Sequence, residues 1–142
     1  MSPLPQERWH RREELVREHM ESENVQEWER TMATFSHPRY ELFDGRVIDG
    51  REDVMAYWLE GRSEVPDQRN QLIELEHVGD DHVLIEFWLR GTPRSTGKPF
   101  EVRLWALYDF DEDDLMTNER VYRQRPTEDQ VAGRITPAGT PA

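Results

Sequence analysis

The stretch that decides the fold runs from residue 83 to residue 110, as VLIEFWLR (83–90), GTPRSTGK (91–98) and PFEVRLWALYDF (99–110). In the first and last of these segments every second side chain is apolar. Such a period of two is typical of β-strands, in which alternate side chains point to opposite faces. The residues that share one predicted apolar face are Val83, Ile85, Phe87, Leu89, Phe100, Val102, Leu104, Ala106 and Tyr108.

Two more strands are predicted around this pair, at residues 71–78 and 115–124. The connections at 79–81 and 111–114 are short and rich in Gly and Asp, which favours an antiparallel meander. The second face of the sheet is mixed, and it carries Trp88 and Trp105. Tryptophans on an outer sheet face indicate a covering partner, so we predict a homodimer through that face.

The segment before the sheet has helical periodicity. Residues 7–35 predict a long amphipathic helix that bends near 22–24, where Asn24 and Glu27 have the spacing of an N-cap and its capping-box partner. Asp49 and Glu52 indicate the start of a second helix, and residues 40–43 a short extended segment between the two. Helices followed by a curved antiparallel sheet predict an α+β fold with the helices on the concave face. A cavity at the wide end is then the default ligand site.

Composition limits the remaining possibilities. A chain of 142 residues fits one domain, predicted at residues 1–124, and the Pro- and Gly-rich residues 125–142 predict a flexible tail. The absence of cysteine excludes disulfides and thiolate nucleophiles, and the net charge of -12 argues against nucleic-acid and membrane partners. No signal peptide or membrane span is readable, so a cytoplasmic location is expected.

Several segments, taken in order, resemble one known family: HPRYELFDGRVIDGREDVMAYW, PDQRNQLIELEH, VLIEFWLRGT, TGKPF and ERVY. From about His19 to Tyr122 the chain resembles the SnoaL-like, polyketide-cyclase and ester-cyclase branch of the NTF2-like superfamily. The resemblance implies a cone-shaped α+β barrel that is usually dimeric, encloses a hydrophobic pocket and needs no cofactor. It does not imply one reaction, because this fold hosts isomerases, cyclases, hydrolases and non-catalytic domains.

The chain departs from this family at two places. Relatives commonly read GTH before a longer loop, whereas this chain reads GTP at 91–93. Relatives also tend to end the last strand with ERVYFD, whereas here Gln124 stands at the position of the acidic residue. A glutamine amide does not exchange protons near neutral pH, so acid–base chemistry of the family type is not expected at that position.

The candidate catalytic residues are Arg120, Tyr122, Gln124 and His19. Alternation places the first three on one face of the last strand, which the resemblance turns toward the pocket, where they would polarise a carbonyl oxygen. The alternative is that Arg120 pairs with a carboxylate, Tyr122 packs in the core and Gln124 lies in solvent. His19 is either a base or a hydrogen-bonded core residue.

Aromatic and aliphatic side chains form the candidate ligand-binding set, which would line a pocket if one is open and fill the core if not: Trp28, Tyr40, Tyr57, Trp58, Phe87 and Leu89. None of the five histidines has two further ligands at metal spacing, so neither a metal site nor a cofactor is predicted.

Three functions remain open. The first is a cofactor-independent isomerase-, cyclase- or hydrolase-like enzyme acting on a small hydrophobic carbonyl compound. The second is a non-catalytic ligand-binding or accessory dimer, and the third is a structural dimer with a filled cone.

Overall fold

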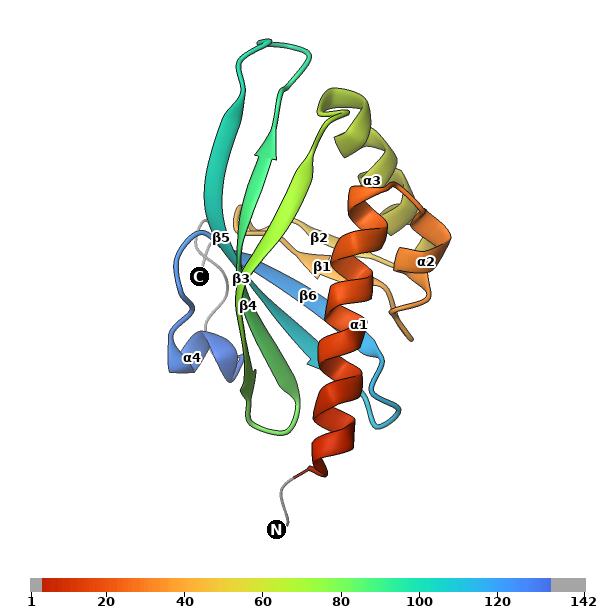
Figure 1. Ribbon diagram of the computed structural model, residues 1–142, viewed down its shortest axis with the longest axis vertical. Helices are drawn as coiled ribbons and strands as arrows, with labels where there is room; N and C mark the ends of the chain where they lie inside the picture. Colours follow the sequence, from red (N-terminus) through yellow and green to blue (C-terminus); the bar gives the residue numbers. More distant parts are fainter. Residues whose placement is uncertain (1–3, 134–142) are drawn as a thin grey trace.

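A computed structural model describes residues 4–133 of the chain. It consists of one curved sheet with helices α1 (Gln6–Asn24), α2 (Trp28–Met32) and α3 (Arg51–Glu64) on its concave face, as Figure 1 shows. Two of these helices come first in the chain, α3 follows the short strands β1 and β2, and all three precede the four long strands. The α+β prediction is confirmed.

Six strands build the sheet, in the order β2-β1-β6-β5-β4-β3. The meander predicted from the period of two consists of β3 (Arg69–Val78), β4 (His82–Gly91), β5 (Phe100–Phe110) and β6 (Met116–Tyr122), all antiparallel. The short strands β1 (Arg39–Glu41) and β2 (Val47–Asp49) extend the sheet, and β1 runs parallel to β6. This parallel pairing sets Tyr40 beside Glu119, 79 positions later in the chain.

Two predicted helix starts are wrong. Asn24 ends α1 rather than capping α2, and its side-chain amide instead pairs with the backbone of Asn70 on β3 at 3.0 and 2.8 Å. Gly50 precedes α3, and Asp49 contacts the His37 ring. In both cases a contact with a distant segment replaces the local hydrogen bond that the sequence favours.

The N-terminal half of α1 is anchored by a single carboxylate. Asp114, in the β5–β6 turn, accepts hydrogen bonds from Arg8, Arg11 and Arg12 at about 3 Å. These hydrogen bonds outweigh the effect of burial and lower the pKa of Asp114 to about 2. The turn thereby fixes the start of α1 against the sheet.

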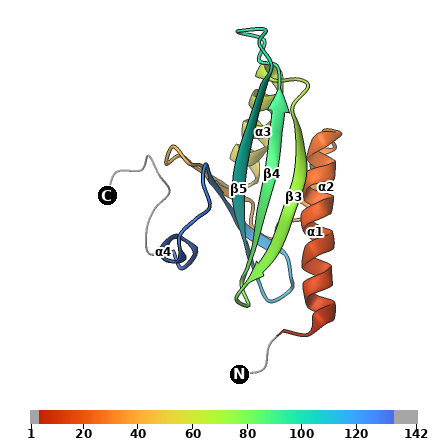
Figure 2. The ribbon, with the colours of Figure 1, turned by 60° about the vertical axis from the view of Figure 1, so that its left-hand side comes forward.

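The outer face of the sheet carries a fourth helix, α4 (Glu128–Val131), on the side opposite α1 (Figure 2). Val131 packs against a cluster that includes Leu84 and Leu107, and a capping box at Thr127 starts the helix. Residues 125–133 of the predicted tail thus include a short packed helix, residues 134–142 lie outside the described part, and the flexibility of the tail stays a prediction.

The outer-face tryptophans are partly covered by the chain itself. Trp105 belongs to the cluster under α4, and Trp88 lies between the guanidinium groups of Arg90 and Arg103. Homodimerisation through this face stays a prediction. Among residues 4–133, no helix combines the length and the apolar composition that crossing a membrane requires.

Candidate functional site

A cavity of about 210 Å³ lies between the concave face of the sheet and the helices. Its mouth is bordered by the β1–β2 turn and by α3. All six residues predicted to bind ligand lie on its wall: Trp28, Tyr40, Tyr57, Trp58, Phe87 and Leu89. The cone is therefore open in this structure rather than filled.

The aromatic wall is held by ring contacts between α2, α3 and β1. Trp28 stacks on Trp58 with ring centroids 5.4 Å apart, and Tyr40 contacts both Tyr57 and Trp58. The Trp58 indole also donates a hydrogen bond to the Tyr40 hydroxyl at 3.1 Å. Offset and edge contacts of this kind fix ring orientation as well as burying area, so the wall is a preformed apolar surface.

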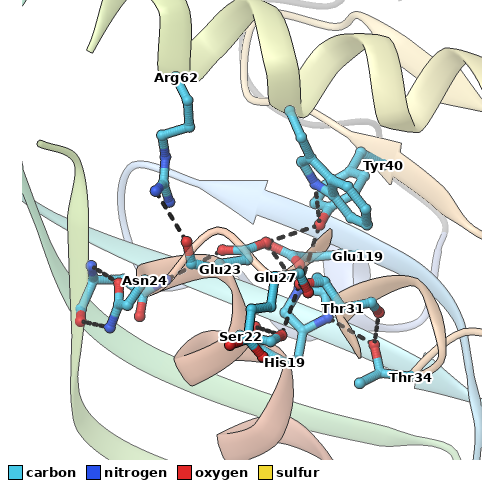
Figure 3. A network of polar contacts seen from close by, with 12 residues as sticks. His19, Ser22, Glu23, Asn24, Glu27, Thr31, Thr34, Tyr40, Arg62 and Glu119 are labelled. Atoms are coloured by element: carbon cyan, nitrogen blue, oxygen red, sulfur yellow. Dashed lines mark hydrogen bonds and ion pairs between the residues drawn. The ribbon is translucent and has the colours of Figure 1, made fainter. Parts of the chain in front are cut away.

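The polar floor of the cavity is made by Glu23 of α1 and Glu119 of β6, and His19 of α1 lies directly beneath them (Figure 3). The His19 Nε2 atom lies 3.1 Å from a carboxylate oxygen of Glu23 and 3.1 Å from one of Glu119. His19 is 1% exposed, and both glutamates line the cavity. A ligand in the cavity can therefore contact the carboxylates but not the imidazole beneath them.

The hydrogen bonds around His19 indicate its protonation state. The Thr34 hydroxyl donates to the Thr31 carbonyl at 2.6 Å, so its oxygen accepts from His19 Nδ1–H at 2.8 Å. With Nδ1 protonated, an Nε2 atom facing two carboxylate oxygens must also carry a proton. Burial lowers the pKa of His19, but the charge of Glu23 and hydrogen bonds with both glutamates raise it overall to about 10.

Glu119 is buried on the cavity wall beside His19. It is 7% exposed, and its Oε1 atom lies 3.1 Å from His19 Nε2 without the geometry of a good hydrogen bond. Burial raises the pKa of Glu119, while contacts with His19 oppose the rise. The net effect is a raised pKa, and a buried carboxyl group with a raised pKa is suited to proton transfer.

The neighbouring groups keep fixed protonation states. Burial and the nearby glutamates raise the pKa values of Tyr40 and Tyr108 well above the ordinary value, so both remain phenols that donate hydrogen bonds. Glu23 accepts from the Tyr40 hydroxyl at 3.2 Å and from the Asn70 amide at 3.1 Å. Glu23 is thus held by two neutral donors as well as by His19.

The same three side chains form the one group, among the described residues, whose ligand atoms are close enough for a metal ion, all within 4.8 Å of one another. A metal ion would need the Nε2 lone pair of His19. That atom faces both carboxylates at ion-pair distance, as a protonated ring does. The hydrogen bonds of residues 4–133 therefore favour a proton site.

The predicted orientation of Arg120, Tyr122 and Gln124 is wrong. Tyr122 packs on the outer face in the cluster under α4, and Arg120 pairs there with Asp109 at 2.8 Å. Gln124 lies beyond the end of β6 and is exposed. The pairing of β6 with β5 explains the error, because it sets Glu119 opposite Tyr108 and so turns Glu119, not Arg120, toward the cavity.

The polar residues of the site that were not predicted from the sequence include Glu23, Arg62 and Glu119. Glu119 carried a usable signal, because it is an acidic residue in a predicted strand with apolar Val121 on the same face. Glu23 lies in the acidic run ESEN at the end of α1, and such a run looks like any solvated helix end.

Comparisons with known proteins agree with this fold. The SnoaL-like domain model matches residues 16–119. No protein of curated function matches the chain in sequence.

Solved structures share the architecture at low identity. A ketosteroid isomerase-like protein from Catenulispora acidiphila, in complex with trimethylamine, is 18% identical with a TM-score of 0.69, and the match covers 90% of this chain and 94% of that one. SalBIII, an epoxide hydrolase/cyclase-like enzyme of pyran ring formation in salinomycin, is 14% identical with a TM-score of 0.72, over 81% and 92%.

A third structure is RV0760c from Mycobacterium tuberculosis in complex with estradiol-17beta-hemisuccinate. It is 19% identical with a TM-score of 0.68, and the match covers 78% of this chain and 91% of that one. Identities this low show the fold alone, whereas the domain model matches most of the sequence. The chain therefore belongs to the SnoaL-like family and has the NTF2-like fold.

Proposed function

We propose that this protein is a cofactor-independent enzyme that moves a proton on a small hydrophobic carbonyl compound held in the cavity. The observation that carries the proposal is the buried carboxyl group of Glu119, which lies on an aromatic cavity wall and whose pKa is raised by burial. Isomerisation and cyclisation both need such a group, since each begins with loss of a proton next to a carbonyl and ends with its return elsewhere.

Glu119, His19 and the two tyrosines have separate roles in this proposal. Glu119 takes the proton from carbon as a carboxylate and gives it back, so the carboxylate is regenerated after each turnover. His19 stays protonated beneath it and stabilises the carboxylate before the transfer. Tyr40 and Tyr108 do not compete for the proton, because the pKa values of both phenols are raised.

The structural neighbours support a small-molecule role without defining a reaction. SalBIII is described as an epoxide hydrolase/cyclase-like enzyme, and RV0760c was crystallised with a steroid ester. These ligands and reactions belong to those proteins. They make polycyclic and polyketide-like ketones a rational first panel for this one.

Hydrogen–deuterium exchange tests the proposal before any product is known. Candidate ketones are incubated in deuterated buffer with the protein, and deuterium gained next to the carbonyl is measured by mass spectrometry. Glu119→Gln should lower the exchange rate by 100-fold or more, because general acid–base catalysis contributes about 10²–10⁴-fold. Tyr122→Phe is the matched control on the outer face and should leave the rate unchanged.

A rate that Glu119→Gln does not change would reject the assignment. The second candidate function is ligand binding alone, which the preformed aromatic wall favours. A panel compound that raises the melting temperature without any protein-dependent exchange would support binding over catalysis.

A further inference from the structure

We propose that Arg62 is the binding residue for a carboxylate group, so that the ligand of this cavity is a hydrophobic molecule with one acidic end. The inference rests on the cavity of the proposed function but not on catalysis there. It adds the chemical class of the ligand and a residue that recognises it.

Arg62 is a buried cation with most of its donors unused. It lies on the cavity wall at the C-terminal end of α3 and is 7% exposed. One N–H group donates to the backbone carbonyl of Glu23 at 2.9 Å, and the guanidinium lies over the Trp28 ring. An arginine has five N–H groups, so four have no hydrogen-bond partner among residues 4–133.

The contrast with Arg12 shows what a structural buried arginine looks like in this protein. Arg12 is 2% exposed, pairs with Asp114 at 2.9 Å and donates to the Asp80 carbonyl at 2.6 Å. Arg62 has no carboxylate oxygen within 4 Å in the described part of the chain. Because burying an uncompensated charge is costly, the missing counterion of Arg62 is best explained by a ligand.

The carboxylate of Glu23 acts on Arg62 through its charge but makes its hydrogen bonds to other residues. Glu23 directs its two oxygens to Tyr40, Asn70 and His19 rather than to the guanidinium. Figure 3 shows Arg62 descending from α3 to the backbone of Glu23, apart from His19 and Thr34. Burial lowers the pKa of Arg62, which is consistent with a cation that lacks a close partner.

Guanidinium geometry selects the ligand group. The planar fork of arginine matches a carboxylate in two parallel hydrogen bonds, which are stronger than bonds to a neutral carbonyl. The stacked pair of Trp28 and Trp58 lies beside Arg62 on the wall of the same cavity, where it would contact the apolar part of the ligand. A planar arene or steroid-like acid meets both requirements.

The test compares 2-naphthoate with methyl 2-naphthoate, which share the ring system but not the charge, by isothermal titration calorimetry at pH 7.5. The protein should bind the acid at least tenfold more tightly than the ester. Arg62→Gln should reduce this preference below threefold, and Arg62→Lys should restore part of it. Arg46→Gln is the matched control, because Arg46 also borders the cavity but is exposed and pairs with Asp44.

Equal affinity for acid and ester, or no binding of the acid, would overturn the inference. So would an acid preference that Arg62→Gln leaves intact in a variant that melts cooperatively. The measurement is independent of the catalytic proposal, since Glu119→Gln removes exchange activity but should keep the preference for the acid. Each proposal can thus fail while the other holds.

Discussion

The stability of this protein should fall steeply as the pH rises from 7.5 to 10, because His19 holds a proton in the folded state. Its pKa is raised from 6.5 to about 10 by the glutamates that surround it. A group whose pKa rises on folding keeps its proton in the folded state at pH values at which the unfolded chain has lost it. Its stabilisation is complete below pH 6.5 and is lost by about pH 10.

The magnitude follows from linkage. While the folded state binds one proton more than the unfolded state, each rise of one pH unit lowers the free energy of unfolding by about 1.4 kcal/mol. Over the interval between pH 6.5 and 10 the loss is about 5 kcal/mol. Few other groups complicate the measurement of this slope between pH 6.5 and 10. The chain has one lysine, and the pKa values of all four tyrosines are raised.

Urea unfolding followed by tryptophan fluorescence at pH 7.5, 8.5 and 9.5 measures the slope. The wild type should lose about 1.4 kcal/mol per unit, and His19→Gln should show less than half of that slope. His37, which is exposed and pairs with Asp49, supplies the control His37→Gln with an unchanged slope. A flat wild-type profile, or equal slopes in wild type and His19→Gln, would refute the protonated-histidine interpretation.

Two substitutions test how the scaffold is held around the cavity. Asp114→Asn should destabilise the protein by about 3 kcal/mol in chemical unfolding, because the buried Arg12 loses its counterion. A loss below about 1 kcal/mol would contradict the anchoring role of Asp114. Gly91→Ala should cost about 1–3 kcal/mol, because the added Cβ would lie 2.3 Å from Val65 Cγ1, whereas Gly61→Ala, which meets nothing within 4 Å, should not destabilise.

The sequence predicted the strands well because their hydrophobic alternation is a local signal. Val83, Ile85 and Phe87 identify an inner face without any knowledge of the partner strands. The bounds of the four meander strands were predicted to within two residues. The strand ends and the caps, which depend on contacts such as that between Asn24 and Asn70, differ, and β2 and α4 were not predicted.

The orientation of β6 could not be predicted in the same way. Its inner face carries Glu119 and Val121, and its outer face carries Arg120 and Tyr122, so each face pairs one charged with one apolar residue. Both faces are covered, one by the cavity walls and the other by α4. Without a contrast between buried and solvated sides, alternation gives the two sets of residues but not which set points inward.

The cluster of His19, Glu23 and Glu119 links ligand binding to proton chemistry. Burial raises the pKa of Glu119, and contacts with His19 offset only part of this rise. A hydrophobic ligand that fills the cavity removes water from Glu119 and strengthens the burial effect. The ligand itself therefore drives Glu119 toward taking up a proton, which is the step that a general base must perform. An acidic group bound by Arg62 would fix how far the substrate carbon lies from that base.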